Sequence, residues 1–207
     1  MSGNPLKGLS PLTSRIYIVG IGDDGFQGLT GHARQLIEQA EVLLGTSPLL
    51  RKIPDTNAER IEIGSGLESL KETIVKLPKR STVMLAGGDP LFYGIARYLT
   101  DSFGKDRFEV VPHVSSMQLA FARVKESWDD AYLTNLATQS LDRVVDNIRT
   151  AERVGLFTTE LISPSVVAEA LLDRRIDYFT VYVCENLGTP DEVVTQGDLN
   201  SIRKQSF

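Results

Sequence analysis

Short runs of apolar and β-branched residues recur along the chain. They alternate with segments in which apolar positions repeat every three or four residues. The runs predict strands over residues 15–20, 41–44, 60–63, 82–86, 108–111, 131–136, 154–158 and 178–184. Because strands that alternate with helices are typical of α/β domains with mostly parallel sheets, we expect an α/β fold.

The clearest helical pattern follows the first strand. Ala33, Leu36, Ile37 and Ala40 repeat at the spacing of one helix face, and Thr30 stands where an N-cap is expected. Further helices are predicted over residues 67–77, after Asp89-Pro90, from near Ser115, and after Ser163, where Pro164 suits the first helical position.

The length of 207 residues suits one large domain or two small ones. Residues 1–14 are polar and interrupted by prolines, which predicts a flexible leader. Pro112-His113-Val114 lies near the middle and can join two domains. We therefore expect an N-terminal α/β domain over residues 15–112 and a C-terminal α/β domain over residues 113–207.

Composition narrows the classes of function. The formal net charge is -5, so the chain lacks the overall basic field that attracts nucleic acid. We find no signal peptide and no apolar run of the length that spans a membrane, so we expect no membrane partner. Cys184 is the single cysteine, which excludes an intrachain disulfide and favours a reducing, cytoplasmic location. Cysteine and histidine do not cluster as metal ligands do, so we expect no metal site.

Gly20, Gly22 and Gly25 follow the first strand at the spacing of a dinucleotide-binding loop. In such a loop a helix begins at the third glycine, whereas here the predicted cap is Thr30. Asp23 and Asp24 would also repel a phosphate, at a cost of about 3 kcal/mol per pair of charges. Three interpretations remain open: a dinucleotide site, a tight turn without a ligand, or a loop that lines a site for a ligand without phosphates.

Two further segments follow predicted strands. Gly87 and Gly88 end the fourth strand and permit close approach of a ligand, while Asp89 can cap the next helix and Pro90 fits its first turn. Ser115 and Ser116 open a helix after the fifth strand, where they either cap that helix or reach a ligand. Ligands of open α/β sheets bind at the carboxyl ends of strands, so both segments are candidate binding elements.

The sequence resembles the tetrapyrrole methylase family. The matching pieces occur in the family's order over nearly the whole chain: VGIGDDG, AEVLLGTSPLL, AGGDPLFYGIARYL, VSSMQLAFAR and CENLGTPDEVVTQGDL. The resemblance implies the two-domain tetrapyrrole methylase fold, each domain a mostly parallel sheet flanked by helices, with S-adenosyl-L-methionine in the cleft between the domains. It also implies a homodimer and, by similarity to members that act on ring carbon C-5, methylation of a precorrin in cobalamin biosynthesis.

The resemblance also implies site residues and a partner. The cofactor-binding residues would be Asp23, Gly87, Asp89, Phe92, Ser115, Ser116, Thr158 and Leu187. A fused or separate domain would methylate C-15 and remove a carboxyl group. A further strand is expected beyond Phe207, so the chain is also compatible with a fragment of a longer bifunctional enzyme.

We assign no catalytic residue from the sequence. Methyl transfer to an electron-rich ring carbon mainly requires alignment and exclusion of water, so no covalent intermediate is needed. If a base removes the ring proton, His113 is a better candidate than His32, although a structural role for His113 stays open. Cys184 is expected in the core. Arg97, Arg123 and Arg143 are candidates to face the substrate's carboxylates.

Two other functions remain open. The glycine spacing alone would suit a dinucleotide-dependent oxidoreductase. A non-catalytic tetrapyrrole-binding module would explain why His113 occupies a position that is usually glycine in the family. It would also explain why residues 134–138 read Thr-Asn-Leu-Ala-Thr in place of the family's Ser-Leu-His-Gly-Arg.

Overall fold

The computed structural model describes residues 15–64, 66–77 and 79–207. The chain divides into two compact units, the first ending at Ser115 and the second spanning Ser116–Phe207. This division falls just after the Pro112-His113-Val114 segment at which the sequence predicts the domain boundary. The predicted leader, residues 1–14, lies outside the described residues.

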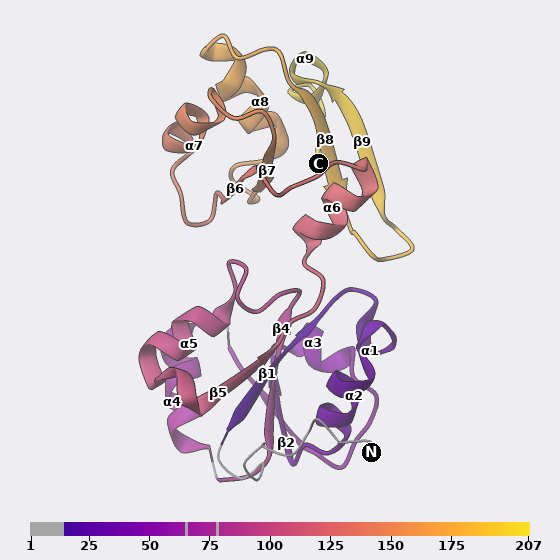
Figure 1. Cartoon of the computed structure of the whole chain (residues 1–207), viewed down its shortest axis with the longest axis vertical. Coiled ribbons are helices and arrows are strands. Elements are labelled where there is room, and N and C mark those ends of the chain that lie inside the picture. Colours follow the sequence, from indigo (N-terminus) through magenta and orange to yellow (C-terminus); the bar gives the residue numbers. More distant parts are fainter. Residues whose placement is uncertain (1–14, 65, 78) are drawn as a thin grey trace, which may run out of the picture. The chain divides into compact units, whose positions relative to one another are not determined.

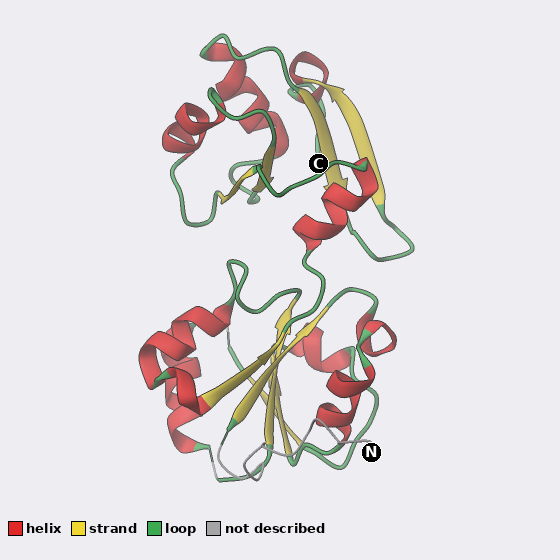
Figure 2. Ribbon diagram, in the orientation of Figure 1, coloured by secondary structure: helices red, strands yellow, loops and turns green. Residues whose placement is uncertain are grey.

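The first unit is a five-stranded parallel sheet in the order β3-β2-β4-β1-β5, covered by helices on both faces (Figures 1 and 2). Its elements are β1 (Ile16–Ile21), α1 (Gly25–Gly28), α2 (Gly31–Glu38), β2 (Val42–Gly45), α3 (Ser47–Arg51), β3 (Glu59–Glu62), α4 (Leu67–Lys76), β4 (Thr82–Gly87), α5 (Ile95–Phe103), a short 3₁₀ helix (Lys105–Arg107) and β5 (Phe108–Val111).

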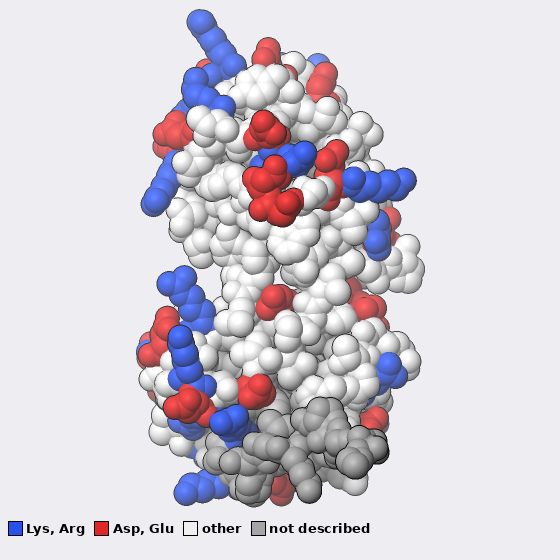
Figure 3. Space-filling model, in the orientation of Figure 1, with Lys and Arg blue, Asp and Glu red and all other residues white. Residues whose placement is uncertain are grey.

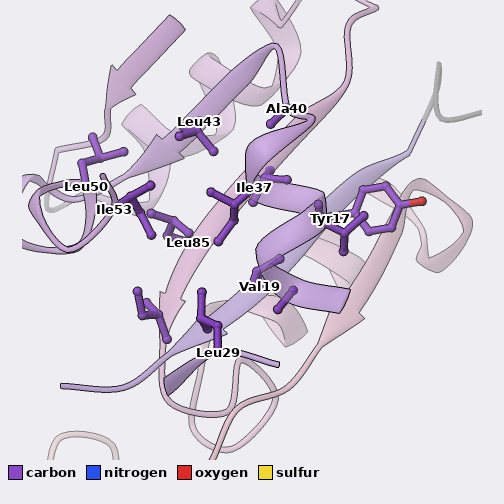
Figure 4. Packing of buried hydrophobic residues seen from close by; sticks show 13 residues of the cluster. Tyr17, Val19, Leu29, Ile37, Ala40, Leu43, Leu50, Ile53 and Leu85 are labelled. Atoms are coloured by element: carbon purple, nitrogen blue, oxygen red, sulfur yellow. The ribbon is translucent and has the colours of Figure 1, made fainter. Parts of the chain in front are cut away.

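Burial on both faces explains why the central strands are continuous apolar runs. Every residue of β1 and β2 is buried, as is β4 up to Ala86. On one face the sheet packs against α2, α3 and the segment after α3 through Ile37, Leu50 and Ile53, which Figure 4 shows with Val19, Leu43 and Leu85. On the other face it packs against α4 and α5. This unit confirms the predicted parallel sheet flanked by helices.

The second unit contains two separate strand pairs. Its elements are α6 (Ser116–Val124), β6 (Tyr132–Asn135), α7 (Leu141–Ile148), β7 (Val154–Phe157), α8 (Pro164–Asp173), β8 (Thr180–Glu185), β9 (Val193–Asp198) and α9 (Leu199–Ile202). β6 and β7 pair in parallel, whereas β8 and β9 pair antiparallel. Parallel pairing in this unit is therefore confined to one strand pair, and β9 is absent from the strands predicted above.

Local signals account for several helix boundaries. The Thr30 side chain accepts a hydrogen bond from Ala33 N at the start of α2, and Ser163 accepts one from Val166 N at the start of α8. Both caps are confirmed as predicted. The predicted cap at Asp89 is wrong, because α5 begins only at Ile95 and its N-cap is Gly94.

Charged side chains of both signs are interspersed on the face of each unit that Figure 3 presents. None of the helices formed by the described residues has the length and apolar character needed to span a membrane.

Candidate functional site

The ends of three adjacent strands meet at the carboxyl edge of the sheet in the first unit. β1 lies between β4 and β5, with Ile21 opposite Gly87 and Val19 opposite Val111. Beyond the paired residues, Gly88 N donates a hydrogen bond of 2.9 Å to Ile21 O. The glycine loop after β1, the turn after β4 and the segment after β5 therefore form one continuous region.

Glycine is required for this close approach. A Cβ atom added at Gly20 would lie 2.1 Å from Gly88 O and 2.7 Å from His113 N, which is backbone of both neighbouring segments. Gly88 itself has φ +59, and a Cβ there would lie 3.3 Å from Ser115 Cα. The structure thus brings Gly88, the neighbour of the predicted site residue Gly87, against the predicted site residue Ser115 near the end of β1.

The glycine loop differs from a dinucleotide loop in the way its helix begins. Gly25 has φ +64 and its N–H donates to Gly22 O, after which α1 makes a single turn. The longer helix α2 begins at Gly31, as the cap at Thr30 predicts. No extended helix therefore presents its free N–H groups at the third glycine, which is the feature that binds a pyrophosphate.

Asp23 is paired with a lysine that the sequence analysis did not identify. Lys52, directly after α3, donates hydrogen bonds from Nζ to Asp23 Oδ1 and, at 3.1 Å, to Gly22 O. The Asp23 side chain is 53% exposed and that of Lys52 is 25% exposed. Nothing local in the sequence reveals this pair, because Lys52 comes from the next α-helical crossover.

Asp24 lies beside His113. The Nε2 atom of His113 is 3.3 Å from Asp24 Oδ1, and the His113 side chain is only 11% exposed. The imidazole is therefore largely enclosed by the segments that meet at β1. His32, by contrast, is exposed on α2.

The turn after β4 is an Asx turn rather than a helix cap. Asp89 Oδ1 accepts a hydrogen bond of 2.9 Å from Leu91 N, and Asp89 O accepts one from Phe92 N. The Phe92 and Tyr93 rings meet edge to face at 4.8 Å between centroids. Gly94 is required next, because a Cβ there would lie 2.2 Å from Pro90 O. The predicted site residues Asp89 and Phe92 thus belong to one tightly held turn.

The remaining predicted site residues lie at element ends. Ser115 is buried and ends the first unit, whereas Ser116 is exposed and opens α6 in the second. Thr158 is exposed directly after β7. Leu187 is buried in the turn that follows β8, between Asn186 at φ 52 and Gly188 at φ 87. Because β7 and β8 belong to different strand pairs, the sheets do not place Thr158 and Leu187 on one edge.

The turn that carries Leu187 is tied to α6. Glu192 Oε2 accepts hydrogen bonds from Gly188 N at 2.8 Å and from Arg123 Nη2 at 2.9 Å. These hydrogen bonds, the one from Arg123 foremost, lower the pKa of Glu192 below its ordinary value. Arg123, expected to be a candidate for the substrate's carboxylates, is thus already paired within its own unit. Arg97 is highly exposed and pairs with Asp101, while Arg143 is exposed on α7.

Cys184, which the sequence analysis expected in the core, is only partly buried in β8. Burial, reinforced by the charge of Glu192, raises the pKa of the Cys184 thiol, so the reactive thiolate is disfavoured at neutral pH. Within residues 15–64, 66–77 and 79–207, no three His, Cys, Asp or Glu side chains gather in a way that could hold a metal ion.

Comparison with known families identifies one family that matches most of the chain. The model of the tetrapyrrole (corrin/porphyrin) methylases matches residues 15–203. The chain belongs to this family. It is 27% identical to the cobalt-precorrin-7 C(5)-methyltransferase of Salmonella typhimurium over 86% of this chain and 87% of that protein. It is 32% identical to the decarboxylating precorrin-6Y C(5,15)-methyltransferase of Mycobacterium tuberculosis over 86% of this chain and 45% of that longer protein.

A solved structure of the family shows the same fold. The uroporphyrin-III C-methyltransferase of Thermus thermophilus, complexed with S-adenosyl homocysteine, superposes with a TM-score of 0.65 at 22% identity, over 92% of this chain and 86% of that one. The two-domain methylase fold expected from the sequence is therefore confirmed.

Proposed function

We propose that this chain is an S-adenosyl-L-methionine-dependent methyltransferase that methylates ring carbon C-5 of a precorrin in cobalamin biosynthesis. The observation that carries the proposal is the convergence of the glycine loop, the Gly87–Phe92 turn and the His113–Ser115 segment in a member of the tetrapyrrole methylase family. The choice of C-5 is supported by the relatives of 27% and 32% identity, both of which are named for this position.

The residues at this edge suit S-adenosyl-L-methionine. Gly87 ends β4 in an exposed position, and a Cβ added there would meet nothing within 4 Å. The main chain is therefore open to a nucleoside at this point. S-adenosyl-L-methionine carries no phosphate, and its sulfonium and ammonium groups outnumber its one carboxylate, so an acidic neighbouring loop is compatible with it.

In this proposal Gly87, Asp89, Phe92 and Ser115 hold the cofactor in the first unit. Asp23, which Lys52 pairs with in the adjoining loop, is proposed to contact the cofactor as well. Ser116, Thr158 and Leu187 of the second unit remain predictions that rest on the family resemblance. When bound, the cofactor supplies an electrophilic methyl group. The chain's own contribution is to orient the reactants and exclude water, the two effects that such a transfer requires.

An oligomeric state, a cellular location and a partner domain are part of the proposed function. We propose a homodimer in the cytoplasm, where a single unpaired cysteine stays reduced. The relative that is matched over 45% of its length is named for both C-5 and C-15. We therefore propose that methylation at C-15 and decarboxylation belong to a partner domain, fused or separate.

Turnover with a ¹³C-methyl cofactor tests this function. The full chain would be incubated with precorrin-7 and, separately, with cobalt-precorrin-7, and the product examined by NMR. We expect one labelled methyl group on C-5 from at least one substrate. Transfer to another ring carbon would contradict the proposed position. Cofactor binding without transfer to either substrate would favour a non-catalytic tetrapyrrole-binding module.

A matched pair of glycine variants controls this experiment. In Gly20→Ala the new Cβ would lie 2.1 Å from Gly88 O, so we expect turnover to be lost with cofactor binding. In Gly31→Ala, at the start of α2, the new Cβ meets nothing within 4 Å, so we expect turnover to be kept. Equal activity in the two variants would contradict the location of the site.

A further inference from the structure

His113 fills a space that glycines of the first loop leave open. A Cβ added at Gly22 would lie 2.8 Å from His113 Nε2 and 2.6 Å from Asp24 Oδ1. A Cβ added at Gly20 would lie 3.0 Å from His113 Cβ. The loop therefore closes around the imidazole, which accounts for the G-x-G spacing without any phosphate ligand.

Asp24 completes this arrangement from the other side. Its Oδ1 lies 3.3 Å from His113 Nε2, while a Cβ added at Gly28 would lie 1.8 Å from its Oδ2. The carboxylate is thus seated between the imidazole and the one-turn helix α1. Replacement of any of these glycines by a larger residue would displace the pair.

Lys52 contacts the same loop at Gly22 and Asp23, the two residues before Asp24. Its ammonium group donates to both Gly22 O and Asp23 Oδ1. The loop is consequently fixed at Asp23 from α3 and at Asp24 from the segment after β5. Two adjacent carboxylates, which would otherwise repel each other and draw in water, each have a cationic or polar partner.

A main-chain hydrogen bond connects the loop to the proposed cofactor site. Ile21 O accepts the hydrogen bond from Gly88 N, and Gly88 lies between Gly87 and Asp89. We propose that His113 and Lys52 are positioning residues for the cofactor, because they fix the loop against which the Gly87–Asp89 turn is set. This inference rests on the proposed function, since it concerns the affinity of the same site.

Calorimetric titration with S-adenosylhomocysteine tests the inference on the full chain. We expect His113→Ala and Lys52→Ala each to weaken binding about tenfold, the size of one lost interaction with a charged group. The controls are His32→Ala and Lys76→Ala, which remove the same side chains at exposed positions of α2 and α4 and should leave affinity unchanged.

Three further measurements separate positioning from other roles. His113→Gln keeps a polar group at the reach of Nε2, so we expect it to restore most of the affinity. The double variant Asp24→Ala/His113→Ala should bind S-adenosylhomocysteine no more weakly than either single variant, because each single change removes the same contact between Asp24 and His113. In turnover, His113→Ala should raise KM for the cofactor about tenfold and change kcat less than about twofold, since its effect is on binding.

The outcomes are distinguishable from failure of the proposed function. If the unmodified chain does not bind S-adenosylhomocysteine, the proposed function fails and this inference with it. If the unmodified chain binds and a folded His113→Ala binds equally well, only the positioning role is overturned. A fall in kcat with unchanged KM would instead make His113 a participant in the chemistry. Loss of folding in both His113→Ala and His113→Gln would overturn the inference, because the role would then lie in folding.

Discussion

Single side chains explain why the first loop imitates a nucleotide-binding motif. Gly20 is adjacent to the backbone of two neighbouring segments, and Gly22 is adjacent to His113. Gly25, the third glycine of the spacing, has φ +64, a backbone conformation that favours glycine. Close approach of other segments thus explains the first two glycines, and the turn conformation explains the third.

Cys184 provides a prediction at this scale. Because burial raises the pKa of its thiol, we expect alkylation by iodoacetamide at neutral pH to be much slower in the folded chain than in denaturant. The rate should rise as pH increases beyond the ordinary range of a cysteine. Cys184→Ser should keep full methyl transfer. Rapid alkylation of the folded protein, or loss of turnover in the variant, would point to a reactive thiol.

Some of the site could be predicted from single residues and some could not. Gly87, Asp89 and Ser115 stand at strand ends, so their meeting at one sheet edge follows from parallel topology. The pairs Lys52–Asp23 and His113–Asp24 join segments far apart in sequence, and no local pattern marks them. Asp89 was predicted to cap a helix because Pro90 follows it, but Gly94 allows the chain to fold back on Pro90 first and delays α5.

At the scale of elements, predictions held where a pattern and its boundary signal agreed. α2 and α8 combine an apolar face with a capping hydroxyl, and both begin where predicted. The strand β9 was missed because its residues are mostly exposed and polar, so its sequence lacks the apolar run that marks the other strands. It forms because β8 offers an unpaired antiparallel edge, which is a tertiary cause.

The C-terminal end of α6 gives a prediction of stability. Lys125 follows α6 at φ 60, and Glu126 N donates to Phe121 O, as in a Schellman ending. A left-handed conformation costs a residue with a Cβ about 1 kcal/mol. Lys125→Gly should therefore stabilise the chain by about 1 kcal/mol in denaturant unfolding, whereas Lys125→Ala, which keeps the Cβ, should change little. Destabilisation by glycine would show that the strain is relieved by contacts of the lysine.

The link between α6 and the β8–β9 turn gives a pH prediction. The pKa of Glu192 is lowered in the folded chain, so its contribution to stability is present above the ordinary glutamate pKa and is lost as pH falls through the folded value. Glu192→Gln should be less stable than the unmodified chain at neutral pH. The difference should shrink as pH falls below the ordinary glutamate pKa and disappear once the carboxyl is protonated in both the folded and the unfolded state. A difference that is independent of pH would show that charge is not its origin.

For the whole molecule, the sequence pattern predicted an α/β chain in two parts, and the structure has a five-stranded sheet in the first unit and two strand pairs in the second. The sheet of the first unit could be predicted from the sequence because burial on both faces produces uninterrupted apolar strands. The pairing in the second unit was harder to predict from the sequence because β8 has a single buried residue and β9 has none. The proposed function of the whole molecule requires that the carboxyl edge of the first sheet bind the cofactor.

Amide NMR of the full chain during titration with S-adenosylhomocysteine tests that claim most directly. We predict that the largest shift changes fall within residues 20–24, 87–92 and 113–116, and that NAD produces none there. Changes confined to other residues, or a response of these segments to NAD alone, would contradict the account.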